Sequence, residues 1–239
     1  GALFVGSHST SGSAFNNTYI ANKAAVNGGA IDLNTTGGYI NGSRFYNNTA
    51  QRNGGAVYVA GENATISNLK VVYDGLSVQS PTLAGLAVSI DGTTIDNISL
   101  EIGDITSTIT ESSSASSAKL AGLVATVNAE NAKNTISNIT LNISSIKTSK
   151  TTSKKAYVGG LIAEVKTSNY VTQLSNISQT NDKLTINVDS SQESIFGGLI
   201  GYAQNVSLDK VTLSKVDITS GSGSASLGGL FGTAKSITE

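Results

Sequence analysis

The sequence predicts an all-β solenoid, a stack of similar coils that each pack on their neighbours. The first observation is a glycine followed by a hydrophobic residue, which returns at a quasi-period of 28, 26, 30, 37, 38, 38 and 31 residues. The second is strict alternation of aliphatic and polar residues, as at Ile139, Leu141 and Ile143, which is typical of strands. The repeat glycines are Gly29, Gly55, Gly85, Gly122, Gly160, Gly198 and Gly229, with Gly1 as an incomplete first copy.

The third observation is a polar composition with little charge. The 239 residues include 60 Ser and Thr and 22 Asn, and the net charge is −1. This balance predicts no electrostatic attraction to nucleic acid, and no apolar run is long enough to span a membrane. The chain has no cysteine, which excludes a disulfide framework, a thiolate metal site and a cysteine nucleophile.

Residues 1–62 form a first block of short coils. Residues 19–31 align with residues 45–57, and both copies read aromatic-x-x-Asn-x-Ala-x-x-Asn-Gly-Gly-Ala-aliphatic. The aromatic residue should fill the coil interior, and Asn and Gly supply the backbone angles of a bend. Through Gly28–Ile31, Gly54–Val57 and Phe45–Asn48, this block resembles the repeats of the chlamydial polymorphic outer membrane proteins. The resemblance implies a right-handed parallel β-helix on a surface protein, often an adhesin.

Residues 63–83 form a transition, and residues 84–239 form a second block of longer coils. Each longer coil opens with a Gly-Leu strand and continues into an aliphatic-x-Asn-aliphatic bend. The bends are Ile95–Ile98, Ile136–Ile139 and Leu174–Ile177, with Leu208–Val211 as a degenerate copy. Through Gly160–Ile162 and Gly198–Gly201, this block resembles the GLUG-type repeats of bacterial surface proteins, which imply a surface location but no defined chemistry.

The two blocks predict different strand registers after the repeat glycine. In the second block Leu161, Ala163 and Val165 should face inward, whereas in the first block Ile31 and Leu33 should do so. A slip of one residue reverses the faces of a strand. We therefore expect a bulge or a changed corner near residues 62–85, within one continuous stack.

The prediction for the whole chain is a single right-handed parallel β-helix of about seven to eight coils. At about 4.8 Å per coil it would be about 35 to 40 Å long. Neither terminal sequence offers the polar cap that a solenoid needs. We therefore expect further coils of the same chain, or a second copy stacked end to end as in a fibre, to cover its ends.

We expect no catalytic site, no metal site and no cofactor. Cleavage of a polysaccharide needs acids or a base clustered on one face, yet Asp32 is followed one coil later by Tyr58, and Glu164 by Tyr202. The tight Gly- and Asp-rich repeat of calcium-binding β-rolls is also absent. The remaining candidates have no matching partner in the sequence: Asp104, Glu111, Asp189, Arg44, Arg52 and the single histidine, His8.

Ten Asn-x-Ser/Thr sequons allow two interpretations. One is N-glycosylation of a secreted chain, and the other is a ladder of buried asparagines stacked at a bend. Asn142 is the best glycosylation candidate because it alternates with aliphatic residues and should point to solvent. The other candidates are Asn34, Asn41, Asn16, Asn47, Asn63 and Asn205, whereas Asn97, Asn138 and Asn176 share the repeated bend motif.

The sequence thus predicts an adhesin-like or structural protein at the cell surface or outside the cell. Its expected partners are copies of itself, further coils, or glycans on another cell. The alternative is a polysaccharide-binding or polysaccharide-cleaving β-helix, which a row of exposed aromatic residues or carboxylates would favour. Tyr58 and Tyr202 are the outward aromatic candidates in the strands after the repeat glycines, and we do not expect them to stack.

Overall fold

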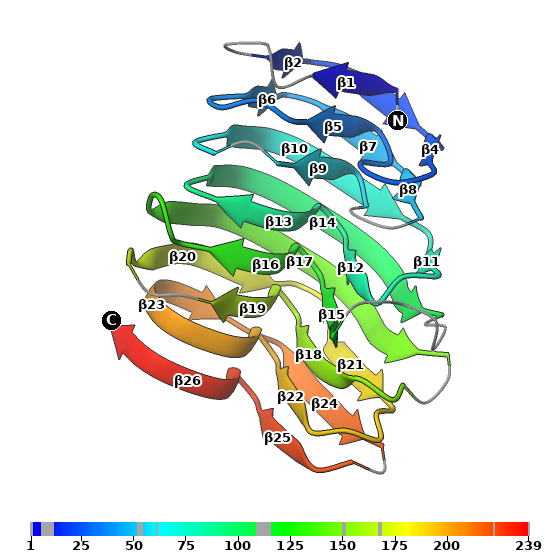
Figure 1. Ribbon diagram of the computed structural model, residues 1–239, viewed down its shortest axis with the longest axis vertical. Helices are drawn as coiled ribbons and strands as arrows, with labels where there is room; N and C mark the ends of the chain where they lie inside the picture. Colours follow the sequence, from blue (N-terminus) through cyan, green and yellow to red (C-terminus); the bar gives the residue numbers. More distant parts are fainter. Residues whose placement is uncertain are drawn as a thin grey trace.

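The computed structural model shows a right-handed parallel β-helix, as predicted (Figure 1). It describes residues 2–5, 12–51, 55–60, 62–108, 116–149, 152–166, 169–221 and 223–238. Within these residues the regular structure consists of strands, and no helix is long and apolar enough to cross a membrane. The stacked strands run parallel to one another, so each coil hydrogen-bonds the next along the axis.

Each coil contributes strands to three faces. We call the face whose strands follow the repeat glycines the marker face. It contains β1 (Leu3–Val5), β5 (Ile31–Leu33), β9 (Val57–Val59), β13 (Ala87–Asp91), β16 (Val124–Asn128), β19 (Ile162–Lys166) and the first parts of β23 (Ile200–Thr212) and β26 (Phe231–Thr238). The third face precedes those glycines and contains β12 (Thr82–Ala84), β15 (Ser117–Ala121), β18 (Lys155–Gly159), β22 (Ser194–Gly197) and β25 (Ala225–Gly228). In the first coils the pair β4 (Lys23–Ala24) and β8 (Thr49–Ala50) precedes the glycines instead.

The remaining strands form the bend face, which also continues into the later parts of β23 and β26. They are β2 (Ser13–Phe15), β3 (Thr18–Ile20), β6 (Tyr39–Asn41), β7 (Arg44–Tyr46), β10 (Thr65–Tyr73), β11 (Leu76–Val78), β14 (Thr94–Ser107), β17 (Asn134–Thr148), β20 (Thr172–Gln179), β21 (Lys183–Val188) and β24 (Lys215–Ser220). The longer strands turn a corner without losing their pairing, because β14 and β17 stay in register from Thr94 to Ser107.

One ladder joins all eight strands of the marker face. Its members lie two residues after each repeat glycine: Leu3, Ile31, Val57, Ala87, Val124, Ile162, Ile200 and Phe231. The eight rungs confirm the predicted number of coils. They also confirm that the repeat glycines stack on one edge of the β-helix.

The repeat glycines are required because neighbouring coils touch there through their backbones. The N–H of Gly122 donates to the carbonyl oxygen of Gly160 at 3.1 Å, and Gly160 donates in the same way to Gly198 at 3.2 Å. A Cβ built on Gly122 would overlap the carbonyl oxygen of Gly160. Gly160 and Gly198 do not have positive φ; close approach of the next coil is the constraint at both.

The aromatic and asparagine residues of the aromatic-x-x-Asn motif in the first block contact one another inside the coils. The rings of Tyr19 and Phe45 stack with centroids 5.0 Å apart. Asn48 is fully buried; its amide donates to the carbonyl oxygen of Tyr19 at 2.9 Å, and its oxygen accepts from the amide nitrogen of Asn22 at 2.9 Å. The motif therefore supplies side-chain hydrogen bonds to backbone groups of the preceding coil, the carbonyl oxygen of Tyr19 and the N–H of Asn22.

The two blocks do differ in register, and the change falls at β13. In β9 the inward residues Val57 and Val59 are two apart, whereas in β13 the inward residues Ala87 and Ile90 are three apart. One extra residue thus enters each later strand of the marker face, as in a β-bulge. This position lies just beyond the predicted window of residues 62–85.

Because of the extra residue, one predicted side-chain orientation is wrong. Leu161 and Val165 point into the main core as expected, but Ala163 does not. Ala163 packs with Ala84, Ala121 and Ala125 in a separate buried cluster at the outer corner between the third face and the marker face. The sequence prediction failed because two adjacent apolar residues, Ile162 and Ala163, point to opposite sides.

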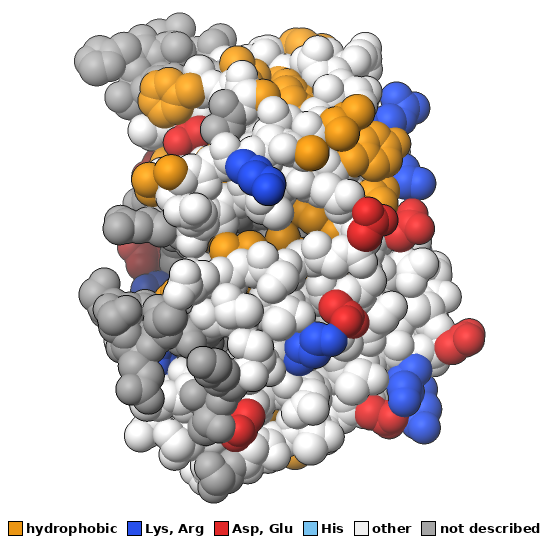
Figure 2. All heavy atoms as spheres, turned by 90° about the vertical axis from the view of Figure 1, so that its right-hand side faces the viewer, with side chains coloured by type: hydrophobic (Ala, Val, Ile, Leu, Met, Phe, Trp, Pro, Cys, Tyr) orange, Lys and Arg blue, Asp and Glu red, His pale blue; other side chains and the backbone are white. Residues whose placement is uncertain are grey.

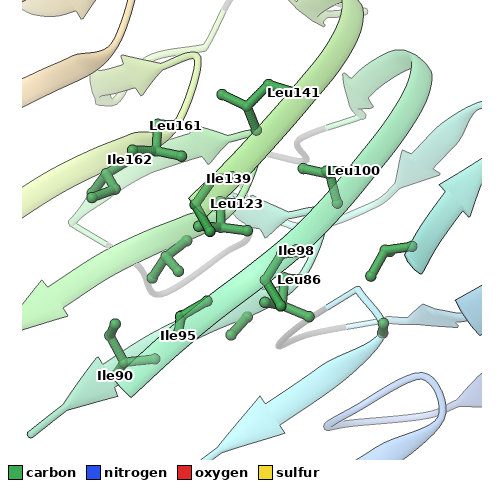
Figure 3. Packing of buried hydrophobic residues seen from close by; sticks show 14 of the residues in the cluster. Leu86, Ile90, Ile95, Ile98, Leu100, Leu123, Ile139, Leu141, Leu161 and Ile162 are labelled. Atoms are coloured by element: carbon green, nitrogen blue, oxygen red, sulfur yellow. The ribbon is translucent and has the colours of Figure 1, made fainter. Parts of the chain in front are cut away.

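The main core fills the interior with columns of aliphatic side chains. Figure 3 shows Ile98 beside Ile139 and Leu100 beside Leu141, which are register partners on β14 and β17. Leu86, Leu123 and Leu161 continue the packing from the glycine corner. Each fully buried aliphatic side chain contributes roughly 1.5–3 kcal/mol relative to an exposed one.

The last described coil is less covered than the others. Leu227 and Leu230 are 48% and 36% exposed, and the interior residues of this coil, such as Phe231, are only partly buried. End-to-end stacking of copies or of further coils stays a prediction.

We predict that Gly122→Ala lowers the free energy of unfolding by about 1–3 kcal/mol, because a well-packed site does not accept an added methyl group. The carbonyl oxygen of Gly160 is held in its ladder and cannot retreat. Urea unfolding followed by circular dichroism measures the change.

Gly229→Ala is the matched control, because it occupies the same ladder position in the last coil and its Cβ would meet nothing within 4 Å. We expect a change of less than about 1 kcal/mol there. Equal losses in both variants would contradict the role of backbone contact between coils.

Candidate functional site

In seven successive coils, one bend contains a residue in the left-handed region of the backbone. The bend position is occupied in turn by Asn16, Gly42, Asn68, Asn97, Asn138, Asn176 and Lys210, whose φ angles lie between 52° and 64°. Asparagine and glycine adopt this conformation at the lowest cost. The predicted asparagine ladder is therefore present, and the requirement of the bend explains why the residue type repeats.

The ladder faces solvent, so the expectation that its asparagines are buried is wrong. Asn68, Asn97, Asn138 and Asn176 are all exposed. The amide of Asn97 donates to the oxygen of Asn68 at 2.7 Å, and that of Asn176 donates to Asn138 at 3.0 Å. Between these pairs the amide of Asn138 turns to the carboxylate of Asp96 at 2.7 Å instead.

A polar depression lies beside the first four members of this ladder, and we call it the Arg44–Lys70 depression. Its lining consists of Asn16, Gly42, Ser43, Arg44, Asn68, Leu69, Lys70, Asn97 and Ser99. It lies where the ladder lacks one side chain, because Gly42 stands between Asn16 and Asn68. Residues that the sequence suggested separately, Asn16 as a sequon and Arg44 as a lone arginine, meet at this place.

The charges around this depression are not balanced. Arg44 and Lys70 are direct register partners on β7 and β10, and both are exposed. Glu101 approaches Lys70 at 3.5 Å, but Arg44 makes no ion pair within the described residues. In the lower half of Figure 2, by contrast, basic side chains lie beside acidic ones on a mostly uncharged surface.

The outer corner, already described by its alanine cluster, is a second polar site. Lys119 of β15 and Glu164 of β19 form an ion pair at 2.6 Å, with side chains 18% and 12% exposed. Lys119 also donates to the hydroxyl of Thr126 at 3.2 Å. The carboxylate of Glu164 is therefore already occupied by an ammonium group.

A pair of aromatic residues lies at the same corner. The sequence analysis did not predict this pair. Tyr157 of β18 meets Tyr202 of β23 edge to face, with ring centroids 6.3 Å apart. Lys155 lies 5.3 Å from the first ring and Lys235 lies 5.9 Å from the second. Only residues after the repeat glycine were compared in the sequence, whereas Tyr157 lies three residues before its glycine.

Lys155 also binds the carboxylate of Glu193 at 3.1 Å. Burial is the largest single influence and lowers the pKa of Lys155, but the interactions with Glu193 and Tyr157 together outweigh it, so the pKa of Lys155 lies above its ordinary value. Lys155 therefore keeps its charge beside Tyr157 at neutral pH.

Two acids meet elsewhere, which the comparison of equivalent positions did not reveal. The amide of Asn131 donates to Glu62 at 2.8 Å and to Asp91 at 2.9 Å, across three coils. Asp104 binds Lys147 at 2.6 Å, and hydrogen bonds from Lys147 and Ser145 hold the pKa of Asp104 below its ordinary value.

These acids do not form a larger cluster. Within the described residues no three His, Cys, Asp or Glu side chains are grouped to hold a metal. His8, Arg52 and Glu111 lie outside the described residues.

The glycosylation candidates differ in exposure. Asn142, Asn16, Asn47 and Asn63 are exposed, whereas Asn34, Asn41 and Asn205 are only half-buried. Asn41 and Asn34 are thus less accessible than expected, and the amide of Asn41 also donates to Tyr39 and Ser67 at 3.0 Å. Asn47 exchanges two hydrogen bonds with Asp74.

The fold and its ladders define the class of protein as a repeat protein built as a parallel β-helix. Residues 42–60 match the model of the Chlamydia polymorphic membrane protein repeat. The matched segment contains Phe45, Asn48 and the Gly55–Val57 corner, so the chain carries at least one repeat of this type within its β-helix. No curated protein and no solved structure gives a significant match to the chain.

We predict that Asn142 carries an N-glycan when the chain passes through a secretory pathway with N-glycosylation, because its side chain is exposed on a regular strand. Peptide mapping by mass spectrometry should find the modification there and lose it in Asn142→Gln. Asn41 is the internal control and should stay bare. A bare Asn142 beside an occupied Asn41 would contradict this prediction.

Proposed function

We propose that this chain is an adhesin-like surface protein outside the cell, which presents side chains on a stiff support and catalyses no reaction. The polymorphic membrane protein repeat at residues 42–60 supports a location at the cell surface or outer membrane. The observation that carries the proposal is that this repeat sits in a ladder continuous through eight rungs. Such a ladder holds exposed side chains at fixed distances along the stack.

The state of the carboxylates supports a role without catalysis. A general acid or base must reach the proton that it transfers. Glu164 is held by Lys119 at 2.6 Å, and Glu62 and Asp91 share the amide of Asn131. Each of these acids is engaged in joining neighbouring coils.

The outer corner favours one second candidate, binding of a neutral polysaccharide. Aromatic rings on a rigid sheet offer contact area for sugars at a low cost in conformational entropy. Tyr157 and Tyr202 lie together there, with lysines beside both rings. The sequence analysis named a row of exposed aromatic residues as the feature that would favour this alternative, whereas Tyr157 and Tyr202 form a single half-buried pair.

An adhesion assay tests the main proposal. We expect beads coated with the purified chain to adhere to cultured animal cells, and beads coated with Gly229→Ala to adhere equally. Beads coated with Gly122→Ala should adhere less after incubation at a temperature that unfolds this destabilised variant but not the native chain. Absence of adhesion in the native chain, or equal adhesion of Gly122→Ala after confirmed unfolding, would contradict the proposal.

A degradation assay tests the absence of catalysis. We expect no new reducing ends and no unsaturated products when the chain is incubated with uronate-containing and neutral polysaccharides. Release of such products that Glu164→Gln abolishes would establish the enzymatic alternative. Tyr170→Ala, which removes an exposed tyrosine outside the corner, serves as the variant with unchanged corner chemistry.

A further inference from the structure

We infer that the Arg44–Lys70 depression is a binding site for the sulfate or carboxylate group of an acidic saccharide. The inference rests on the proposed function for its extracellular setting and names the chemical class of the ligand. It starts from the placement of like charges. Arg44 and Lys70 are directly opposite each other on adjacent strands, an arrangement that destabilises a sheet.

The cost of this arrangement is relieved only at Lys70, which Glu101 approaches at 3.5 Å. The like-charged register partners Lys183 and Lys215 on β21 and β24 differ, because Asp217 lies 3.1 Å from the first and 3.7 Å from the second. Arg44 has no acidic partner of this kind within the described residues. An anion bound between Arg44 and Lys70 would supply the missing negative charge.

The chemistry of arginine narrows the range of chemical groups that the ligand can carry. A guanidinium presents parallel N–H groups that match a carboxylate or sulfate with two hydrogen bonds. Arg44 is exposed at the end of the Gly42–Ser43 bend, so its fork can reach a group that enters from solvent. Lys70 adds a second donor one strand away.

The asparagines supply the contacts that a sugar needs. Asn68 and Asn97 form one mutual hydrogen bond at 2.7 Å, which leaves the amide N–H groups of Asn68 and the oxygen of Asn97 to face solvent. Amide groups both donate to and accept from hydroxyls. Their mutual hydrogen bond joins the two side chains before a ligand arrives.

Gly42 allows an asparagine side chain to join the lining. It occupies the ladder position between Asn16 and Asn68 without a side chain, and the depression is lined by all three. The side-chain oxygen of Asn16 lies where a Cβ at Gly42 would stand. The same residue that satisfies the bend therefore lets the amide group of Asn16 lie against it at the depression.

The test measures binding of the full chain, produced without glycosylation, to soluble dextrans by biolayer interferometry. Glycans must be absent because Asn16 and Asn97 are themselves sequons. We expect binding to sulfated or carboxymethylated dextran and none to uncharged dextran, and the two charged forms distinguish the group preferred. Inorganic sulfate should compete weakly, because it lacks the hydroxyls that the asparagines contact.

Variants then locate the site. Arg44→Gln should weaken binding about tenfold or more, the loss expected for a hydrogen bond to a charged group, and Arg44→Lys should restore it only in part. Asn97→Gly keeps a backbone that tolerates positive φ and should weaken binding by removing the amide. Lys210→Gln is the control for charge, because it removes one positive charge from the bend face at the ladder position of Asn97, outside the depression.

Three results would overturn the inference. Equal losses in Arg44→Gln and Lys210→Gln would indicate general attraction to charge, and binding to phosphatidylserine vesicles but not to either charged dextran would indicate a lipid ligand. Loss of cell adhesion with retained dextran binding would contradict the proposed function alone. Retained adhesion without dextran binding would overturn the saccharide site alone.

Discussion

The contact between backbones at the glycine corner is the constraint on which the rest of the β-helix depends. From Gly85 through Gly122 to Gly160 and Gly198, each N–H donates to a carbonyl of the next coil at 2.8 to 3.2 Å. Because no Cβ fits between these groups, the corner fixes both the spacing of the coils and their register. All other ladders, including the bend that carries the exposed asparagines, inherit that register.

The single register explains how two different kinds of coil share one core. The shorter coils of the first block alternate at once after the glycine, as at Ile31 and Leu33, whereas the later coils insert one residue. The inserted residue is Val88 in β13 and a smaller residue in the next three coils, Ala125, Ala163 and Gly201. A Cβ on Gly201 would lie 2.5 Å from a carbonyl oxygen of the preceding coil. The insertion changes the outer surface and leaves the interior columns unbroken.

The sequence predicted the features that repeat at equivalent positions of successive coils. It missed contacts between residues that lie at different positions within their coils. The repeat glycines, the number of coils and the asparagine ladder all follow from residues at equivalent positions. The orientation of Ala163 did not, because two neighbouring apolar residues give no alternation to read. Tyr157 lies before its repeat glycine and Tyr202 lies after its own. Glu62 and Asp91 are joined by an asparagine of a third coil. A comparison of equivalent positions therefore reveals neither contact. The Arg44–Lys70 depression likewise required the register between β7 and β10.

The stacking of coils through parallel ladders also determines how such a rod responds to force. Tension along the axis pulls directly on the hydrogen bonds of one ladder step, so coils are expected to peel away singly and not to slide past one another together. Each released coil of 26 to 38 residues would add about 100 Å of extended chain. A support that resists bending can thus also lengthen in steps, limiting the load that any attached contact experiences.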